Sequence, residues 1–312
     1  MSKVIFGVDV GGTTIKLGCF DTEGNLLDKW EIPTRTEDKG SNIIGDIAGS
    51  ILVKLAKDDI DKKDVIGIGI GVPGPVKSDG NVIVAVNLGW KDVNVSQELS
   101  DLTDIPVRAS NDANVAALGE MWKGGGQGHS NVVAVTLGTG VGGGIIVDGK
   151  IVNGATGAGG EIGHIHLEDN ETEICGCGGY GCLEQYASAT GIVRIARKKL
   201  ADSSKDSILR EEEISAKSVW DAVKAGDELA IEVAGIYGEY LGKGLAAVAD
   251  VVNPEIFVIG GGVSKAGRVV IEYMEPYFDR YVFSGAKNVK FALAKLGNDA
   301  GIYGAARLMI DK

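Results

Sequence analysis

The stretch VIFGVDVGGTTIKLGCFDTEG (4–24) decides the fold, because an apolar run, a Gly-Gly-Thr-Thr turn and a second apolar run follow one another. This pattern predicts two antiparallel strands joined by a tight turn. It recurs as NVVAVTLGTGVGGGIIVDGK (131–150), about 127 positions later. Repetition of a whole supersecondary unit at this distance predicts a duplicated chain with two similar α/β halves.

The rest of the chain alternates between apolar runs and helical periodicity, as an α/β fold requires. We expect a smaller domain from residues 1–111 with 299–312, and a larger one from 112–298. The expected strands are 26–32, 65–76, 107–110 and 256–259, and the expected helices are 43–55, 115–120, 183–200, 229–252, one that opens at the glycines 260–262, and 299–310.

Charge and hydropathy exclude several classes of protein. Lys and Arg number 31 against 43 Asp and Glu, a net charge of −12, which argues against binding nucleic acid or an anionic membrane. No run reaches the roughly 18 apolar residues of a membrane helix. The start, MSKVIFGVDV, lacks the features of a secretory signal. We therefore expect a cytoplasmic protein.

Both glycine-threonine turns are candidate phosphate sites. Backbone N–H groups in such turns form anion-binding concavities, and a nearby lysine adds a point charge. The alternative is an ordinary hairpin with solvated neighbours. Gly138, Gly140 and Gly143 form G-x-G-x-x-G, but a strand follows instead of the helix that a dinucleotide fold needs. The predicted phosphate contacts are Gly11, Gly12, Thr13, Thr14, Lys16, Gly138, Thr139 and Gly140.

The segment Asn111-Asp112-Ala113-Asn114 follows a predicted strand and begins a helix. Asp and Asn are favoured helix caps, which is the structural alternative. A carboxylate here can also accept the proton of a substrate hydroxyl as that oxygen attacks a γ-phosphoryl group. With two phosphate turns in the same chain, we interpret Asp112 as a catalytic base.

Three cysteines lie between residues 175 and 182, eleven residues after His164. Cys175, Cys177, Cys182 and His164 form a Cys₃His set suited to a closed, tetrahedral zinc site. A disulfide or free thiols are the alternatives. His166 competes with His164 as the fourth ligand, and the isolated Cys19 is expected to be buried.

The paired turns and a third glycine cluster at 260–262 resemble the ribonuclease H-like superfold of actin, hsp70 and the sugar kinases. That resemblance implies that the two turns hold nucleotide phosphates from opposite sides. It also implies that Gly261 and Gly262 lie near the adenosine and that Asp9 helps to position Mg²⁺ bound with ATP.

The segments Glu161-Ile-Gly-His164 and Cys175-x-Cys177-Gly-x-x-Gly-Cys182-x-Glu184 resemble the signature of the ROK family (repressors, open reading frames and kinases), over essentially the whole chain. The resemblance implies a sugar kinase with Asp112 as base, structural Zn²⁺, and a homodimer or homotetramer. Asn87-Leu88-Gly89-Trp90 resembles a stretch of glucokinase members, which favours glucose. The implied sugar contacts are Asn111, Asp112, Glu161, His164 and Glu184.

Two alternatives remain open. N-acetylmannosamine, fructose, mannose or allose kinases share most of these motifs. Some ROK members are sugar-responsive regulators with a DNA-binding helix-turn-helix ahead of the first hairpin. Here only three residues precede the first strand, the net charge is −12 and Asp112 is present, so we expect an enzyme.

Overall fold

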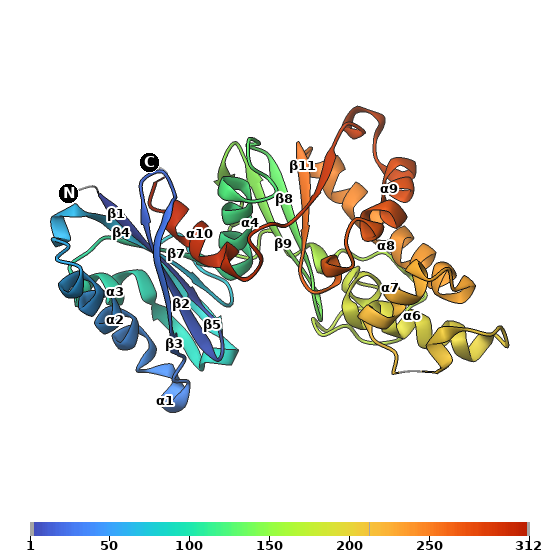
Figure 1. The fold of residues 1–312 in the computed structure, drawn as a ribbon, viewed down its shortest axis with the longest axis horizontal. Coiled ribbons are helices and arrows are strands. Elements are labelled where there is room, and N and C mark those ends of the chain that lie inside the picture. The colour runs from blue at the N-terminus through green and yellow to red at the C-terminus, as the bar shows by residue number, and fades with distance from the viewer. Residues whose placement is uncertain (1–2, 212, 311–312) are drawn as a thin grey trace.

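A computed structural model describes residues 3–211 and 213–310 and contains two mixed five-stranded sheets, one in each half (Figure 1). The first has the order β3-β2-β1-β4-β7 and the second the order β10-β9-β8-β11-β12. In each sheet the first three strands in sequence are antiparallel and the other two run parallel to the first. The two halves therefore have one topology, which confirms the predicted duplication and the ribonuclease H-like fold class. The strands are β1 (Val4–Val10), β2 (Thr14–Asp21), β3 (Leu26–Pro33), β4 (Val65–Val72), β7 (Val107–Asn111), β8 (Val132–Leu137), β9 (Val141–Val147), β10 (Lys150–Ile151), β11 (Ile256–Gly260) and β12 (Lys290–Leu293).

Helices cover the outer faces of the sheets, and two helices lie between the sheets (Figure 1). The first sheet buries its apolar side chains against α2 (Ile43–Lys57) and α3 (Val95–Thr103). The second packs against α6 (Ala189–Asp202), α7 (Ala216–Lys224), α8 (Glu228–Val252) and α9 (Val269–Tyr281). None of the described helices is long and apolar enough to cross a bilayer. The remaining elements are α1 (Glu37–Gly40), α5 (Glu184–Ala187), the hairpin β5 (Asn81–Ala85) and β6 (Trp90–Asn94), and the 3₁₀ segments η1 (Lys62–Asp64), η2 (Val86–Leu88), η3 (Ile162–His164), η4 (Ile208–Arg210), η5 (Val263–Ala266), η6 (Ser284–Ala286) and η7 (Gly297–Asp299).

The helices between the sheets are α4 (Asp112–Lys123) and α10 (Ala300–Arg307), and they touch backbone to backbone. A Cβ added to Gly304 of α10 would stand 1.5 Å from the carbonyl oxygen of Val115 in α4. Only glycine permits this approach. Helix α10 also packs on β1 and β4, while α4 packs on β8 and β9, so this helix pair joins the two halves.

Two helix predictions were wrong. Residues 183–200 form two helices instead of one, because Ser188 is extended (φ −95°, ψ 176°) and caps α6 by accepting a hydrogen bond from Gly191 N–H at 2.9 Å. After the glycines at 260–262 the chain forms only η5, and Gly267, at φ +92°, separates it from α9. The long helix predicted over 229–252 is confirmed as α8.

Candidate active site and metal centre

The two glycine-threonine turns occupy equivalent places, at the tips of β1–β2 and β8–β9. Gly11 N–H donates to Thr14 O at 3.1 Å, and Gly138 N–H donates to Gly140 O at 3.0 Å. Neighbouring hydroxyl groups fix both turns: Thr34 Oγ1 donates to Gly11 O at 2.7 Å, and Thr190 Oγ1 donates to Thr139 O at 2.8 Å. Both loops are thus held in shape while their tips stay accessible.

The third glycine cluster lies against the second turn. Gly261 has φ +83°, and an added Cβ would stand 2.5 Å from the carbonyl oxygen of Leu137, the residue that leads into the turn. Beside it, Gly262 lines a pocket of about 220 Å³ together with Trp220 and Lys217 of α7. The structure therefore brings together the predicted phosphate and adenosine positions of this half.

Asn111, and not Asp112, is the cap of α4. Its Oδ1 accepts hydrogen bonds from Ala113 N–H at 2.9 Å and Asn114 N–H at 3.3 Å, and its Nδ2 donates to Gly74 O at 3.1 Å. Asp112 Oδ1 also accepts from Ala113 N–H at 2.8 Å, so Asn111 supplies the cap while Asp112 makes one local backbone contact. Asp112 is the first helical residue, and its side chain is accessible. Loss of surrounding solvent nevertheless raises the pKa of Asp112, against the lowering effect of the hydrogen bonds from Ala113 and Asn111.

Asp9 and Lys16 face each other across β1 and β2, where they are register partners. Burial raises the pKa of Asp9 to about 6; Lys16 opposes this shift and Asp112 adds to it. Lys16 Nζ donates to Asn298 O at 2.9 Å, just before α10. The predicted base, magnesium residue and phosphate lysine therefore lie close enough to interact electrostatically.

The loop that follows β10 contacts α4 through one side chain. Asn114 Nδ2 donates to Asn153 Oδ1 at 3.3 Å, a contact that the sequence did not indicate. The loop ends at Glu161, which is exposed and precedes η3. Glu161 lines a groove of about 200 Å³ with Ile162 and Val248. His164 stands at the end of η3, three residues from Glu161.

The four predicted metal ligands gather at one point. The ligand atoms of His164, Cys175, Cys177 and Cys182 all lie within 4.8 Å of one another. Cys175 Sγ is 3.8 Å from His164 Nδ1, and Cys177 Sγ is 3.7 Å from Cys182 Sγ. A tetrahedron with metal–sulfur bonds of about 2.3 Å has edges of about 3.8 Å, so these two pairs have the spacing of a tetrahedral metal site.

The distance between Cys177 Sγ and Cys182 Sγ also excludes a disulfide between them. A disulfide needs about 2.05 Å between sulfurs, and all four cysteines are free. His166 is engaged elsewhere: its Nδ1 lies 2.7 Å from Tyr180 O and its Nε2 2.8 Å from Asp169 Oδ1. Burial raises the pKa of the Cys182 thiol to about 12, which a bound cation would reverse.

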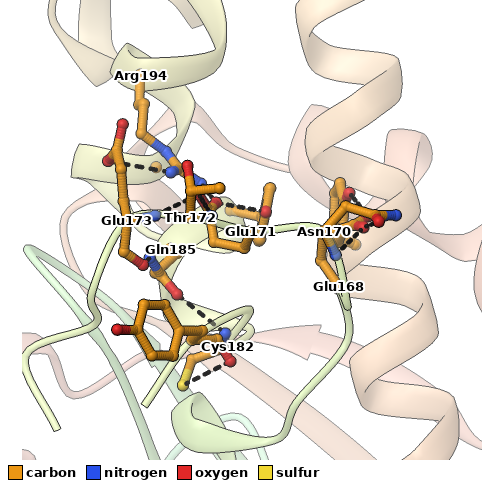
Figure 2. A network of polar contacts seen from close by, with 12 residues as sticks. Glu168, Asn170, Glu171, Thr172, Glu173, Cys182, Gln185 and Arg194 are labelled. Carbon is orange, nitrogen blue, oxygen red and sulfur yellow. Dashed lines mark hydrogen bonds and ion pairs between the residues drawn. The ribbon is translucent and has the colours of Figure 1, made fainter. Parts of the chain in front are cut away.

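A polar network anchors residues 165–183, the proposed metal loop, to the helices of the second half (Figure 2). The Glu171 carboxylate lies 2.7 Å from Arg194 Nη2 and accepts a hydrogen bond from Tyr186 Oη at 2.5 Å. Arg194 also pairs with Glu173 at 3.2 Å, and its guanidinium lies over the Tyr186 ring. Burial tends to raise the pKa of Glu171, but hydrogen bonds from Arg194 and Tyr186 outweigh it and lower the pKa to about 2.

The same network reaches the metal ligands directly. Gln185 Nε2 donates to Glu173 O at 2.9 Å, and Gln185 Oε1 accepts from Cys182 N–H at 3.1 Å (Figure 2). Sequence reasoning missed Glu171, Arg194 and Gln185. Their spacing follows no motif, and only folding brings residues 171–173 against α6.

Glu184 connects the metal loop with the second phosphate turn. Its Oε2 accepts a hydrogen bond from Val141 N–H at 3.1 Å, and its Oε1 accepts one from Cys175 Sγ at 3.6 Å. A Cβ added to Gly140 would stand 2.0 Å from Glu184 Oε2. The residue predicted for sugar binding thus touches both the metal loop and the phosphate turn.

Comparisons with known proteins agree with this geometry. The profile of the ROK family matches residues 5–312. A glucokinase from Halalkalibacterium halodurans is 44% identical over 97% of this chain and 94% of its own length. A ROK family glucokinase from Streptomyces griseus, solved with glucose and AMPPNP, is 34% identical with a TM-score of 0.72 and 98% of each chain covered. A xylose repressor from Caldicellulosiruptor bescii is 29% identical over 98% of this chain and 78% of the repressor.

Proposed function

Because this chain belongs to the ROK family, we propose that it is an ATP-dependent hexose kinase that transfers the γ-phosphoryl group of ATP to the 6-hydroxyl of glucose. The observation that carries the proposal is the accessible Asp112 carboxylate at the start of the helix that joins two halves, each with a fixed glycine-threonine turn. The 44% identity to a glucokinase over nearly the whole chain, and the similarity to a glucokinase solved with glucose and an ATP analogue, support the choice of substrates.

In this proposal Asp112 accepts the proton of the sugar hydroxyl as that oxygen attacks the γ-phosphorus. Phosphoryl transfer asks mainly for positioning and charge neutralisation. The backbone N–H groups of the two turns hold the phosphates, with Lys16 alongside, and the pocket at Gly262 takes the adenosine. Mg²⁺ bound with ATP neutralises phosphate charge, and Asp9 is the residue that would position it.

Asn111, Asp112, Glu161, His164 and Glu184 are the proposed sugar contacts. Carboxylates accept hydrogen bonds from vicinal hydroxyls, and Asn111, whose Oδ1 already accepts two helix N–H bonds, can donate through its second Nδ2 hydrogen. We propose zinc at His164, Cys175, Cys177 and Cys182, since a Cys₃His set with tetrahedral edges suits Zn²⁺ and leaves no open coordination position. His164 can bind the metal through one ring nitrogen and orient toward the sugar through the other.

We also propose that residues 1–111 with 299–312 move as one unit against 112–298, closing over the sugar and excluding water. Packing of α10 on β1 and β4 supports this division. The proposed assembly is a homodimer or homotetramer. The proposed compartment is the cytoplasm, where thiols stay reduced and ATP is available.

The direct test is a coupled assay with purified protein, ATP and a panel of glucose, mannose, fructose, allose, N-acetylmannosamine and N-acetylglucosamine. We expect glucose to give the highest kcat/KM. Preference for another hexose would correct the substrate and keep the kinase. Binding of glucose without any phosphoryl transfer would instead favour the sugar-responsive regulator that the similarity to a xylose repressor suggests.

A further inference from the structure

A cavity of about 340 Å³ lies between the open edges of the two sheets, apart from the proposed active site. The turn 77–79 and β7 form its wall in the first half, and β10 with Asn153 forms its wall in the second. Leu118 of α4 and Leu308, next to α10, complete it. The described residues that line it include none of those proposed for catalysis, sugar, nucleotide or metal binding.

Positive charge is concentrated at this cavity although the chain as a whole carries −12. Among the described lining residues, Lys77 and Arg108 come from the first half and Lys150 from the second, and Asp79 supplies a carboxylate. The Asp79 carboxylate already accepts a hydrogen bond from Asn81 N–H at 3.0 Å. Arg108 Nη1 donates to Leu308 O at 2.9 Å, which holds the guanidinium at the wall. A recess lined mainly by one sign of charge attracts ions of the other sign.

One buried polar atom of the cavity lining, and a second on a residue bonded to the lining, lack a partner among the described residues. Ser110, which lines the cavity, is 4% exposed, and its Oγ has no hydrogen-bond partner. Asn114 is 2% exposed and bonds through Nδ2 to the lining residue Asn153, while its Oδ1 has no partner. Buried polar groups are nearly always satisfied, so unpaired ones beside a cavity indicate a missing bonding partner.

We propose that this cavity is a second binding site, for a small phosphorylated anion that also carries hydroxyl groups, such as a hexose phosphate. Lys77 and Lys150, one from each half, supply the positive charge that the −1.5 to −2 of a phosphoryl group at neutral pH would complement. Ser110 and Asn153 can bond sugar hydroxyls, since both are donors and acceptors. The volume lies at the lower end of ligand pockets, roughly 300–1,000 Å³.

The position of the site suggests what its occupant does. An anion held between Lys77 or Arg108 and Lys150 links the two halves, and Ser110 directly precedes Asn111 and Asp112. The occupant therefore resists any change in the distance between β7 and β10. Any effect of the occupant on phosphoryl transfer depends on the proposed function being correct. Binding of the occupant to the cavity does not depend on it.

Binding is tested by isothermal titration calorimetry of the intact protein with glucose 6-phosphate, fructose 6-phosphate and inorganic phosphate. Each titration is repeated with saturating glucose and AMPPNP, so that binding at the proposed active site is separated from binding at the cavity. We expect one saturable site that persists under both conditions and prefers a hexose phosphate to inorganic phosphate. If glucose 6-phosphate binds more tightly, the occupant is the product of the proposed reaction. If fructose 6-phosphate binds more tightly, the occupant is a metabolite made by another reaction.

The double variant Lys77→Gln/Lys150→Gln should weaken this binding at least tenfold. Lys62→Gln/Lys287→Gln, which changes one exposed lysine in each half away from the cavity, should leave it unchanged. Ser110→Ala should weaken it several-fold without lowering the Tm, because the hydroxyl has no partner to lose. The proposal is overturned if no probe binds, if binding disappears with glucose and AMPPNP present, or if Lys77→Gln/Lys150→Gln binds as tightly as the parent.

Discussion

Glu184 Oε2 accepts a hydrogen bond from the backbone N–H of Val141 at 3.1 Å, and this contact joins the metal loop to the second phosphate turn. The other carboxylate oxygen is 3.6 Å from Cys175 Sγ. A proposed sugar contact is thus held by a backbone N–H next to a proposed phosphate turn and lies beside a proposed metal ligand.

Asp112→Asn should lower kcat by about 10²–10⁴, the usual contribution of a general base, with glucose affinity largely retained. Asparagine keeps the size of the side chain but cannot take a proton. A coupled assay measures kcat and calorimetry measures glucose binding. Asp206→Asn, at an exposed position in the second half, is the matched control. Full activity in Asp112→Asn would refute its assignment as the base.

Gly140→Ala should raise the KM for glucose several-fold, because the new methyl group would stand 2.0 Å from Glu184 Oε2 and displace that carboxylate from Val141 N–H. Gly45→Ala is the control. Gly45 lies within α2 and an added Cβ meets nothing within 4 Å, so alanine should be neutral or stabilise the helix by about 1 kcal/mol. Unchanged KM values for both substrates in Gly140→Ala would show that Glu184 and the turn are not coupled.

The protein should hold about one zinc per chain, and its removal by a chelator should abolish glucose binding. Without a metal, the thiols and imidazole lose the bonds that fix residues 161–184. Elemental analysis gives the metal content, and amide hydrogen exchange should show faster exchange in this segment. Cys177→Ser should reproduce the effect, whereas Cys19→Ala, outside the cluster, should keep its zinc. Metal-free protein that binds glucose normally would contradict the structural role.

Asp9→Asn should make the protein more stable at pH 7 but not at pH 4. The pKa of Asp9 is about 6 in the folded state against 3.8 normally, so the folded state binds more protons and loses stability as pH rises between these values. This difference between the folded-state pKa and the normal pKa of Asp9 corresponds to roughly 3 kcal/mol in the free energy of unfolding. Urea unfolding of both proteins at pH 4, 5, 6 and 7 measures it. A constant difference across this range would contradict the raised pKa.

Glu171→Gln should destabilise the second half by about 2–3 kcal/mol, because it leaves the Arg194 guanidinium without its buried partner. The pKa of Glu171 is lowered to about 2, so its contribution is present above about pH 4.5 and disappears as pH falls toward 2. The parent and the variant should therefore converge in acid. Glu173→Gln, whose side chain is 67% exposed, should cost less than about 1 kcal/mol. Equal losses in both variants would show that the Glu171 pair has no special role.

Much of the site was predictable because its signals are local. Paired glycine-threonine turns, the Asn111-Asp112 helix start and the cysteine cluster each lie within a few residues, and each has a backbone or ligand requirement that few sequences meet. The break at Ser188 was missed although Ser is a favoured cap, because apolar periodicity continues across it. The cap of α4 was left open because neighbouring Asn and Asp are equally good candidates, and only coordinates show which side chain bonds the helix N–H groups.

By itself the sequence determined the duplicated α/β fold, the two glycine-threonine turns and the Cys₃His set, because hydrophobic periodicity and glycine act over short stretches of chain. Only the tertiary structure decided that Glu184 bonds Val141, that Glu171 pairs with Arg194, and that Lys77, Arg108 and Lys150 surround one cavity. These contacts join residues that no local pattern relates, and they exist because packing of α4 and α10 between two sheets sets which surfaces meet.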